Sequence, residues 1–156
     1  MITCQFEDGG KAELRHVTMD VVVVKDGKVI MEKRTKGLLE SGKWGITGGY
    51  MARDEDIFGT VEREVFEETG WRVENITLLR IKHWPDRPSE DRQNVSFVFC
   101  ADAARHEGEK DWESDEVKWF PLEDLPNQIA FDQADDIEVY KRYKKGEITV
   151  PMLHKL

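Results

Sequence analysis

The sequence is poor in cysteine and contains no long apolar run. Its two cysteines, Cys4 and Cys100, stand far apart and form no CxxC pair, which argues against a disulfide framework or a cysteine-rich zinc site and indicates a reducing compartment. No apolar stretch approaches the roughly 18 residues of a membrane-spanning helix, and the start MITCQFEDGG lacks the pattern of a signal peptide. We therefore expect a cytoplasmic protein that does not contact a membrane.

Basic residues are also outnumbered, with 23 lysines and arginines against 32 acids and a net charge of −9. This balance argues against binding of long nucleic acid through bulk electrostatics, but a small anionic substrate held through a metal ion remains compatible. The length suits one domain with a sizeable core, and no repeat or linker divides residues 1–156. The polar residues 1–16 are expected to form an N-terminal arm or hairpin.

The order of the expected elements predicts an α/β fold. Residues 17–24 are β-branched and apolar, as in a buried central strand, and Asp26-Gly27 is a strong hairpin signal before a strand at 28–33. Further strands are expected at 72–83, 94–101 and 117–120, with loops at 84–90 and 105–115. A second helix is expected at 131–145, with Phe131, Ala134, Ile137 and Tyr140 towards the core. This order indicates a mixed sheet between helices.

A helix is expected between Asp56, a good N-cap residue, and Gly70, a natural C-terminal stop. At about 100° per residue its apolar side chains fall within one stripe roughly 100° wide, which indicates that this side faces the core. The stripe consists of Ile57, Phe58, Val61 and Val65.

The carboxylates of this helix begin on its buried side. Glu68 falls inside the apolar stripe, Glu64 about 20° beyond its edge, and Glu67 further round. Residues 56–69 hold five acids and one base, Arg63, and like charges at helical spacing cost roughly 0.2–0.5 kcal/mol per pair. A solvated charged face is the ordinary interpretation. A site for a hard cation such as Mg²⁺ removes the conflict between burial and charge, because carboxylate oxygens are its preferred protein ligands.

The same stretch resembles the Nudix box, with nine specified positions over 23 residues at the family's spacing. One residue departs from the usual pattern, because Thr47 stands before Gly48-Gly49 where the family usually has proline. The resemblance implies a Nudix-type α/β/α sandwich with a central mixed β-sheet. The matching residues are Gly49, Glu55, Arg63-Glu64-Val65, Glu67-Glu68 and Gly70-Trp71.

The resemblance also implies roles for these residues in a metal-dependent hydrolase. Glu64, Glu67 and Glu68, with the carbonyl of Gly48, would ligate Mg²⁺, with Mn²⁺ as the alternative. Glu64 would otherwise act as a general base, oriented by Arg63. The remaining roles are structural and fall to Gly49, Gly70 and Glu55, which would pair with Arg63.

A further carboxylate is expected from the loop before the strand at 117–120. Similarity to the nucleotide-sanitising branch of the family favours Glu113 as a ligand or general base, with Glu116 as the runner-up. The alternative is that these acids are loop surface.

Candidate substrate contacts cluster near the proline-containing loop. Arg87 and Arg92, together with Lys82, would hold a phosphate, unless they are simple surface charges. Trp84 and Trp112 would stack on a base or ribose, or else fill the edge of the core.

Two further features bear on the substrate. The position of Pro85 after the box resembles Nudix enzymes that act on ADP-ribose. The acidic segment 131–136 would instead hydrogen-bond a purine edge, as in oxidised-nucleotide sanitising relatives, unless Asp132 simply caps the helix.

The favoured function is therefore cleavage of the pyrophosphate bond, an acid anhydride, in a nucleoside diphosphate linked to a group X such as the sugar of ADP-ribose or another nucleotide sugar. The alternatives are a nucleoside triphosphate pyrophosphohydrolase and a non-catalytic nucleotide-sensing module. Removal of RNA caps is disfavoured by the net charge of −9. The family resemblance also implies a homodimer.

Overall fold

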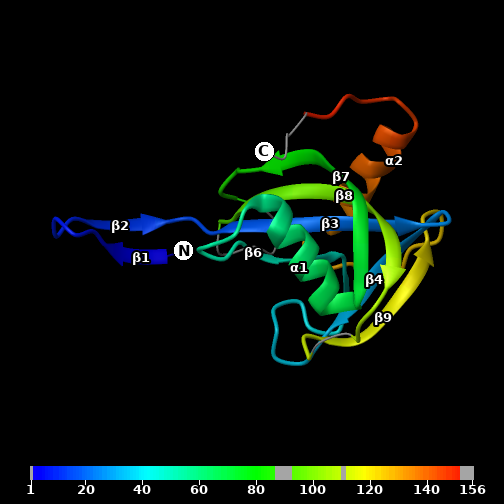
Figure 1. The fold of residues 1–156 in the computed structure, drawn as a ribbon, viewed down its shortest axis with the longest axis horizontal. Coiled ribbons are helices and arrows are strands. Elements are labelled where there is room, and N and C mark those ends of the chain that lie inside the picture. Colours follow the sequence, from blue (N-terminus) through cyan, green and yellow to red (C-terminus); the bar gives the residue numbers. More distant parts are fainter. Residues whose placement is uncertain (1, 87–92, 110–111, 152–156) are drawn as a thin grey trace.

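The computed structural model describes residues 2–86, 93–109 and 112–151 as a sheet with a helix on each face and a separate hairpin (Figure 1). In chain order the strands are β1 (Ile2–Gln5), β2 (Lys11–Leu14), β3 (Val17–Lys25), β4 (Lys28–Arg34), β5 (Trp44–Gly45), β6 (Thr47–Tyr50), β7 (Trp71–Lys82), β8 (Val95–His106) and β9 (Ser114–Pro121). The helices are α1 (Ile57–Thr69) and α2 (Gln133–Lys144).

The central strand is β3, the apolar run of the sequence. It pairs in parallel with β8 and antiparallel with β4 and β6, while β7 borders β8 and both β5 and β9 border β4. The turn from β3 to β4 has positive φ at both Asp26 (48°) and Gly27 (74°), as a two-residue hairpin of the predicted kind requires.

Alternate residues of β3 face the two helices, because successive side chains of a strand point to opposite faces. Val21 and Val23 pack with Val61 and Val65 of α1, whereas the neighbouring Val22 packs with Ile137 and Tyr140 of α2. Both faces of the sheet are therefore buried, and the predicted α/β/α sandwich with a mixed sheet is confirmed.

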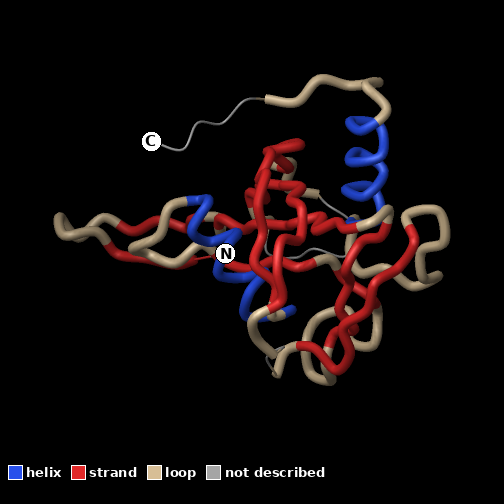
Figure 2. Tube along the Cα trace, turned by 45° about the vertical axis from the view of Figure 1, so that its right-hand side comes forward, coloured by secondary structure: helices blue, strands red, loops and turns tan. Residues whose placement is uncertain are grey.

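The hairpin β1–β2 extends away from the sandwich in both views (Figures 1 and 2). Its two strands pair antiparallel, with Ile2 opposite Leu14. The N-terminal segment that the sequence assigned to an arm or hairpin is thus a hairpin. No helix among the described residues is long and apolar enough to span a bilayer.

Two later strands are longer than predicted. The strand expected at 94–101 continues to His106, and the one expected at 117–120 begins at Ser114. The charged residues assigned to a loop extend both strands because β7 and β4 offer continuous partners along these edges.

The second helix differs from its prediction at its start. It begins at Gln133, because Phe131 takes a left-handed backbone with φ of 52° that an α-helix does not admit. Phe131 is only half-buried and Ala134 is exposed, so their placement in the core was wrong, whereas Ile137 and Tyr140 are buried as predicted.

Candidate functional site

Helix α1 presents its carboxylates in the graded order expected from the helical wheel. Asp56 caps the helix by accepting a hydrogen bond from the Gly59 amide at 2.7 Å, which fixes where the helix begins. Glu68 is then buried, the Glu64 side chain is 12% exposed and the Glu67 side chain is 48% exposed. The carboxylates thus run from the core outwards.

Two glycines of β6 lie directly against this helix. The Gly48 amide donates to Oε2 of Glu68 at 2.9 Å. A Cβ atom at Gly49 would stand 2.5 Å from Oε2 of Glu64, and one at Gly48 would overlap the Met19 carbonyl oxygen of β3. The missing side chain of Gly49 therefore leaves room for the Glu64 carboxylate of α1, and that of Gly48 lets β6 pack closely on β3.

Arg63 holds the exposed side of the carboxylate cluster. Its Nη2 donates to Oε2 of Glu55 at 3.0 Å and to the Tyr50 carbonyl at 3.1 Å. Its Nη1 lies 2.9 Å from Oε1 of Glu64 and 2.9 Å from Oε2 of Glu67. The hydrogen bonds from Arg63 lower the pKa of Glu55 to about 2. Arg63 therefore fixes the orientation of three carboxylates with one guanidinium.

The surroundings of Glu64 disfavour its ionised form. Burial raises its pKa above the usual range, the nearby charges of Glu67 and Glu113 raise it further, and Arg63 offsets only part of this. A divalent cation would relieve the same conflict, and the donor set of carboxylate and backbone oxygens fits Mg²⁺ or Mn²⁺.

The acidic side chains of the described residues are not yet arranged around a metal position. No three His, Cys, Asp or Glu side chains there are gathered closely enough to hold a metal ion. Arg63 engages one oxygen each of Glu64 and Glu67, so a cation binding between these two would compete with it.

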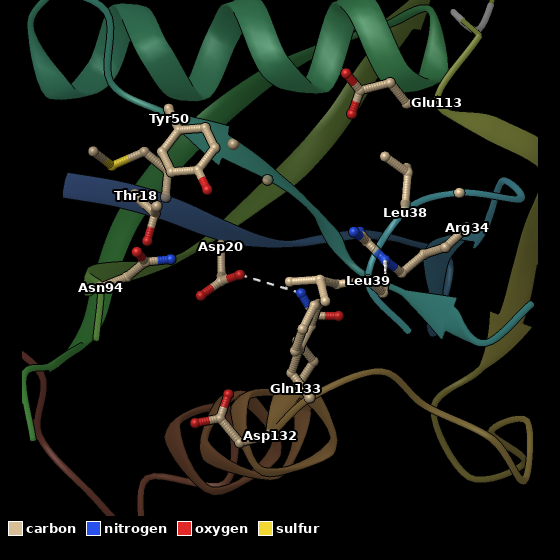
Figure 3. Close-up of a pocket in the computed structure, with 15 residues that line it drawn as sticks. Thr18, Asp20, Arg34, Leu38, Leu39, Tyr50, Asn94, Glu113, Asp132 and Gln133 are labelled. Carbon is tan, nitrogen blue, oxygen red and sulfur yellow. Dashed lines mark hydrogen bonds between the residues drawn. The ribbon is translucent and has the colours of Figure 1, made fainter. Parts of the chain in front are cut away.

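Glu113 lies just before β9, near enough to Glu64 for its charge to act on that carboxylate. It lines a cavity and stands at the end beside α1 in Figure 3. Its charge acts on Glu64, as described above. Glu116, the alternative from the sequence, is 43% exposed and pairs with Lys118 on the surface. Of the two, only Glu113 lies at the cavity.

The cavity of about 460 Å³ runs from the glycines of β6 towards the start of α2. Its polar walls include Asp20, Asn94 and Gln133, and its other walls include Leu38, Leu39 and Phe131. These residues come from separate parts of the chain, as Figure 3 shows.

Beneath the cavity lies a buried ionic network. Lys82 is fully buried, and its Nζ stands 3.1 Å from Asp20, 2.9 Å from Asp132 and 2.8 Å from Asp136. Burial acts to raise the pKa of Asp20, but Lys82 and the hydrogen bonds to Asp20 outweigh it, so the pKa lies below its usual value. Asp136, which also pairs with Arg80, has its pKa raised to about 6 chiefly by burial.

This network corrects two expectations. Lys82 was predicted to hold a phosphate, but three carboxylates surround its buried ammonium. Of the two interpretations of Asp132, a contact to a purine edge or a cap of α2, the second is wrong, because its side chain makes no capping bond and Lys82 binds its carboxylate instead.

The two tryptophans predicted to contact the substrate do not line the cavity, and the two predicted arginines are not described. Arg87 and Arg92 lie outside the described residues. Trp84 is 39% exposed and packs edge-on against His83, while Trp112 is 71% exposed and so does not fill the core edge. Neither tryptophan lines the cavity.

Sequence reasoning named Gly48, Gly49, Glu113 and Asp132 but missed several other residues that line the cavity. Asp20 carried a signal, because it is the one charged residue in the apolar run 17–24. Arg34 ends β4, and Leu38 and Leu39 lie between β4 and β5, where no motif distinguished them. Phe131 was assigned to the core.

Comparison with known proteins identifies the family. The family described as NUDIX domain matches residues 14–143. The chain is 32% identical over 130 residues to an ADP-ribose pyrophosphatase of Methanocaldococcus jannaschii, covering 83% of this chain and 75% of that protein. It is also 32% identical over 119 residues to an oxidized purine nucleoside triphosphate hydrolase of Danio rerio, covering 75% and 72%.

A solved structure shows the same fold. The crystal structure of a UDP-X diphosphatase superposes with a TM-score of 0.76 at 17% identity, over 92% of this chain and 70% of that one. At this identity the likeness is evidence for the fold alone.

Proposed function

The chain belongs to the Nudix family and is a Nudix pyrophosphohydrolase, and we propose that it cleaves the pyrophosphate bond of ADP-ribose or a similar nucleoside diphosphate sugar. The relative from Methanocaldococcus jannaschii, an ADP-ribose pyrophosphatase, supports this substrate. The reaction would yield AMP and ribose 5-phosphate, with water attacking one phosphorus.

The observation that carries the proposal is the packing of β6 against α1. Gly48 and Gly49 bring backbone and the Glu64 and Glu68 carboxylates together. Glu64 has a raised pKa and lies close enough to Glu113, at the cavity, for the two charges to interact. A largely buried carboxylate whose charge is opposed by Glu67 and Glu113, beside an open cavity, is the arrangement that a cation and a phosphate substrate would stabilise.

Each residue then has a role in the reaction. Glu64, Glu67 and Glu68, with the carbonyl of Gly48, would hold Mg²⁺ or Mn²⁺, which when bound offsets phosphate charge and lowers the pKa of the attacking water. Arg63 keeps the carboxylates of Glu64 and Glu67 in place through its two ion pairs.

Glu113, which lines the cavity, would accept a proton from that water. A raised pKa on Glu64 makes this carboxylate an alternative acceptor, because a general base works best with a pKa near the working pH.

A nucleoside triphosphate is the second candidate substrate. The relative from Danio rerio, an oxidized purine nucleoside triphosphate hydrolase, has the same identity to this chain, and Asp132 of the acidic segment 131–136 lines the cavity. Trp84, beside the proline that suggested ADP-ribose, lies outside the cavity, so the preference for ADP-ribose now depends on the first relative.

The ratio kcat/KM decides between the two, because it measures discrimination between substrates. We expect ADP-ribose to exceed dGTP and 8-oxo-dGTP in this ratio, measured with Mg²⁺ and again with Mn²⁺. A large preference for either triphosphate would reverse the assignment.

A further inference from the structure

The cavity contains an acceptor that none of the family's box residues provides. We propose that Asp20 selects the nucleobase, by accepting a hydrogen bond from the exocyclic amino group of an aminopurine such as adenine. The inference rests on the proposed function in one respect, that the substrate is a nucleotide. It assigns the deep end of the cavity to the base and leaves the phosphates at the glycines of β6.

The position of Asp20 is unusual for a carboxylate. It lies in the central strand β3 between the fully buried Met19 and Val21, yet its side chain is 15% exposed and lines the cavity. A charge in a central strand costs free energy unless hydrogen bonds and an opposite charge compensate it. A structural role alone would not require that this carboxylate reach the cavity.

Three donors hold the Asp20 carboxylate in place. Oδ2 lies 3.1 Å from Nζ of Lys82 and accepts a hydrogen bond from the Ser96 hydroxyl, while Oδ1 accepts one from Nε2 of Gln133 at 3.2 Å. Figure 3 shows this last bond and the carboxylate between β3 and α2. A carboxylate has about four acceptor positions, so about one is left on Oδ1 for a ligand.

The charges around this end of the cavity favour donors over acceptors. Lys82 and Arg80 supply two positive charges to the three carboxylates of Asp20, Asp132 and Asp136. Arg34 also lines the cavity, but its Nε donates to the Leu39 carbonyl at 2.8 Å and its guanidinium lies over Phe131. Asp20 and Asp132 line the cavity, and Asp136 does not. A phosphate or a carbonyl edge would meet carboxylate oxygens here, whereas an N–H group would meet a partner.

The other walls indicate a base instead of a sugar. Leu38, Leu39 and Phe131 line the same cavity as Asp20, and the Arg34 guanidinium stands 5.2 Å from the Phe131 ring centre. Apolar and aromatic walls bury the faces of a flat heterocycle, and the few polar groups of such a pocket fix its edge. Adenine presents an amino group at that edge, and hypoxanthine presents a carbonyl oxygen at the same position.

The contact of Asp20 with the base is tested by the binding of nucleoside monophosphates to the whole chain, which needs no hydrolysis. Calorimetry in a chelator-containing buffer compares AMP, IMP and purine riboside 5′-monophosphate, which lacks the amino group. We expect the parent protein to bind AMP at least about tenfold more tightly than either analogue, because an unmatched polar contact in a buried site is costly. Equal affinities would overturn the proposal before any variant is made.

The variant Asp20→Asn then tests the residue. Its amide keeps the shape and one acceptor oxygen and adds a donor that can reach the carbonyl of IMP. We expect the ratio of AMP to IMP affinity to fall to about one or to invert. If the variant weakened AMP and IMP equally, Asp20 would contact a group that both share, such as the ribose, and the assignment to the base would be wrong.

Asp136→Asn is the matched control. Asp136 bonds the same Lys82 and is fully buried, but it does not line the cavity. We expect it to leave the AMP to IMP ratio unchanged, with thermal unfolding showing that both variants are folded. An equal shift in the control would overturn a direct contact from Asp20.

The outcomes for the two proposals are separable. Discrimination between AMP and IMP that depends on Asp20, with no cleavage of any nucleotide, would contradict the hydrolase alone. Cleavage of ADP-ribose without such discrimination would contradict the role of Asp20 alone.

Discussion

Alanine at the two neighbouring glycines of β6 should have opposite consequences. Neither glycine has a left-handed backbone, so the added methyl group, and not strain in φ, decides the outcome. At Gly49 the methyl group meets the end of the Glu64 side chain, and at Gly48 it meets the backbone of β3. We therefore predict that Gly49→Ala folds without activity and that Gly48→Ala is destabilised.

The size of the first effect follows from the geometry. The new Cβ at Gly49 would overlap the Glu64 carboxylate, and even the farther oxygen, Oε2, would lie only 2.5 Å away, whereas atoms in contact normally keep about 3.5 Å. The Glu64 carboxylate must therefore move by at least about 1 Å, which its flexible side chain allows at little cost to stability. A displacement of about 1 Å in a catalytic group costs about 10²-fold in rate.

At Gly48 the obstacle cannot rotate away. The Cβ would overlap the Met19 carbonyl oxygen and lie 3.1 Å from Cα of Asp20, so the pairing of β6 with β3 must shift. Forcing extra volume into a packed core costs about 1–3 kcal/mol. For a chain of this length that lowers Tm by roughly 2–12 °C.

Thermal unfolding and kcat/KM of the two variants, measured beside the parent, test the pair. We expect Gly49→Ala to keep a Tm within about 4 °C of the parent and to lose about 10²-fold in kcat/KM. The reasoning is refuted if Gly49→Ala is as active as the parent, or if it melts as low as Gly48→Ala.

Three further predictions concern single residues. Glu68→Gln should fold with an unchanged or slightly higher Tm, because it removes one member of a repelling cluster. It should lose both turnover and the rise in Tm on adding Mg²⁺, and near-parental turnover would contradict a role of Glu68 as a metal ligand. Glu113→Gln should lower kcat by at least about 10²-fold, whereas Glu116→Gln, on the surface, should change little; equal activity of both would remove the loop from catalysis. Thr47→Val should raise Tm by about 2–4 °C, because the Thr47 hydroxyl is buried without a hydrogen-bond partner among the described residues. Removing that hydroxyl should raise the free energy of unfolding by about 1 kcal/mol, and an unchanged or lower Tm would contradict this.

The arrangement of α1 could be predicted because it depends on local periodicity. The apolar stripe of Phe58, Val61 and Val65 sets which side of the helix faces the core, and 3.6 residues per turn then place Glu68 inwards and Glu67 outwards. The contact of Arg63 with Glu55, which lies before the helix, was expected from the family resemblance and is present. These features need no knowledge of the rest of the fold.

The cavity could not be predicted in the same way. Lys82 binds Asp132 and Asp136, which lie 50 and 54 positions away in the sequence, and nothing local distinguishes it from a surface lysine at the end of a strand. The left-handed backbone of Phe131 turns that residue from the core to the cavity. Such placements depend on how β3, β7 and α2 pack together.

The central claim, metal-dependent cleavage of a pyrophosphate bond at the α1 carboxylates, has one most direct test. ADP-ribose is incubated with the protein and Mg²⁺, with and without excess chelator, and the products are separated by chromatography. The account predicts AMP and ribose 5-phosphate in equal amounts, and neither product with chelator or with Glu68→Gln. Intact ADP-ribose, dGTP and 8-oxo-dGTP in the presence of both Mg²⁺ and Mn²⁺, or turnover that chelator leaves unchanged, would contradict it.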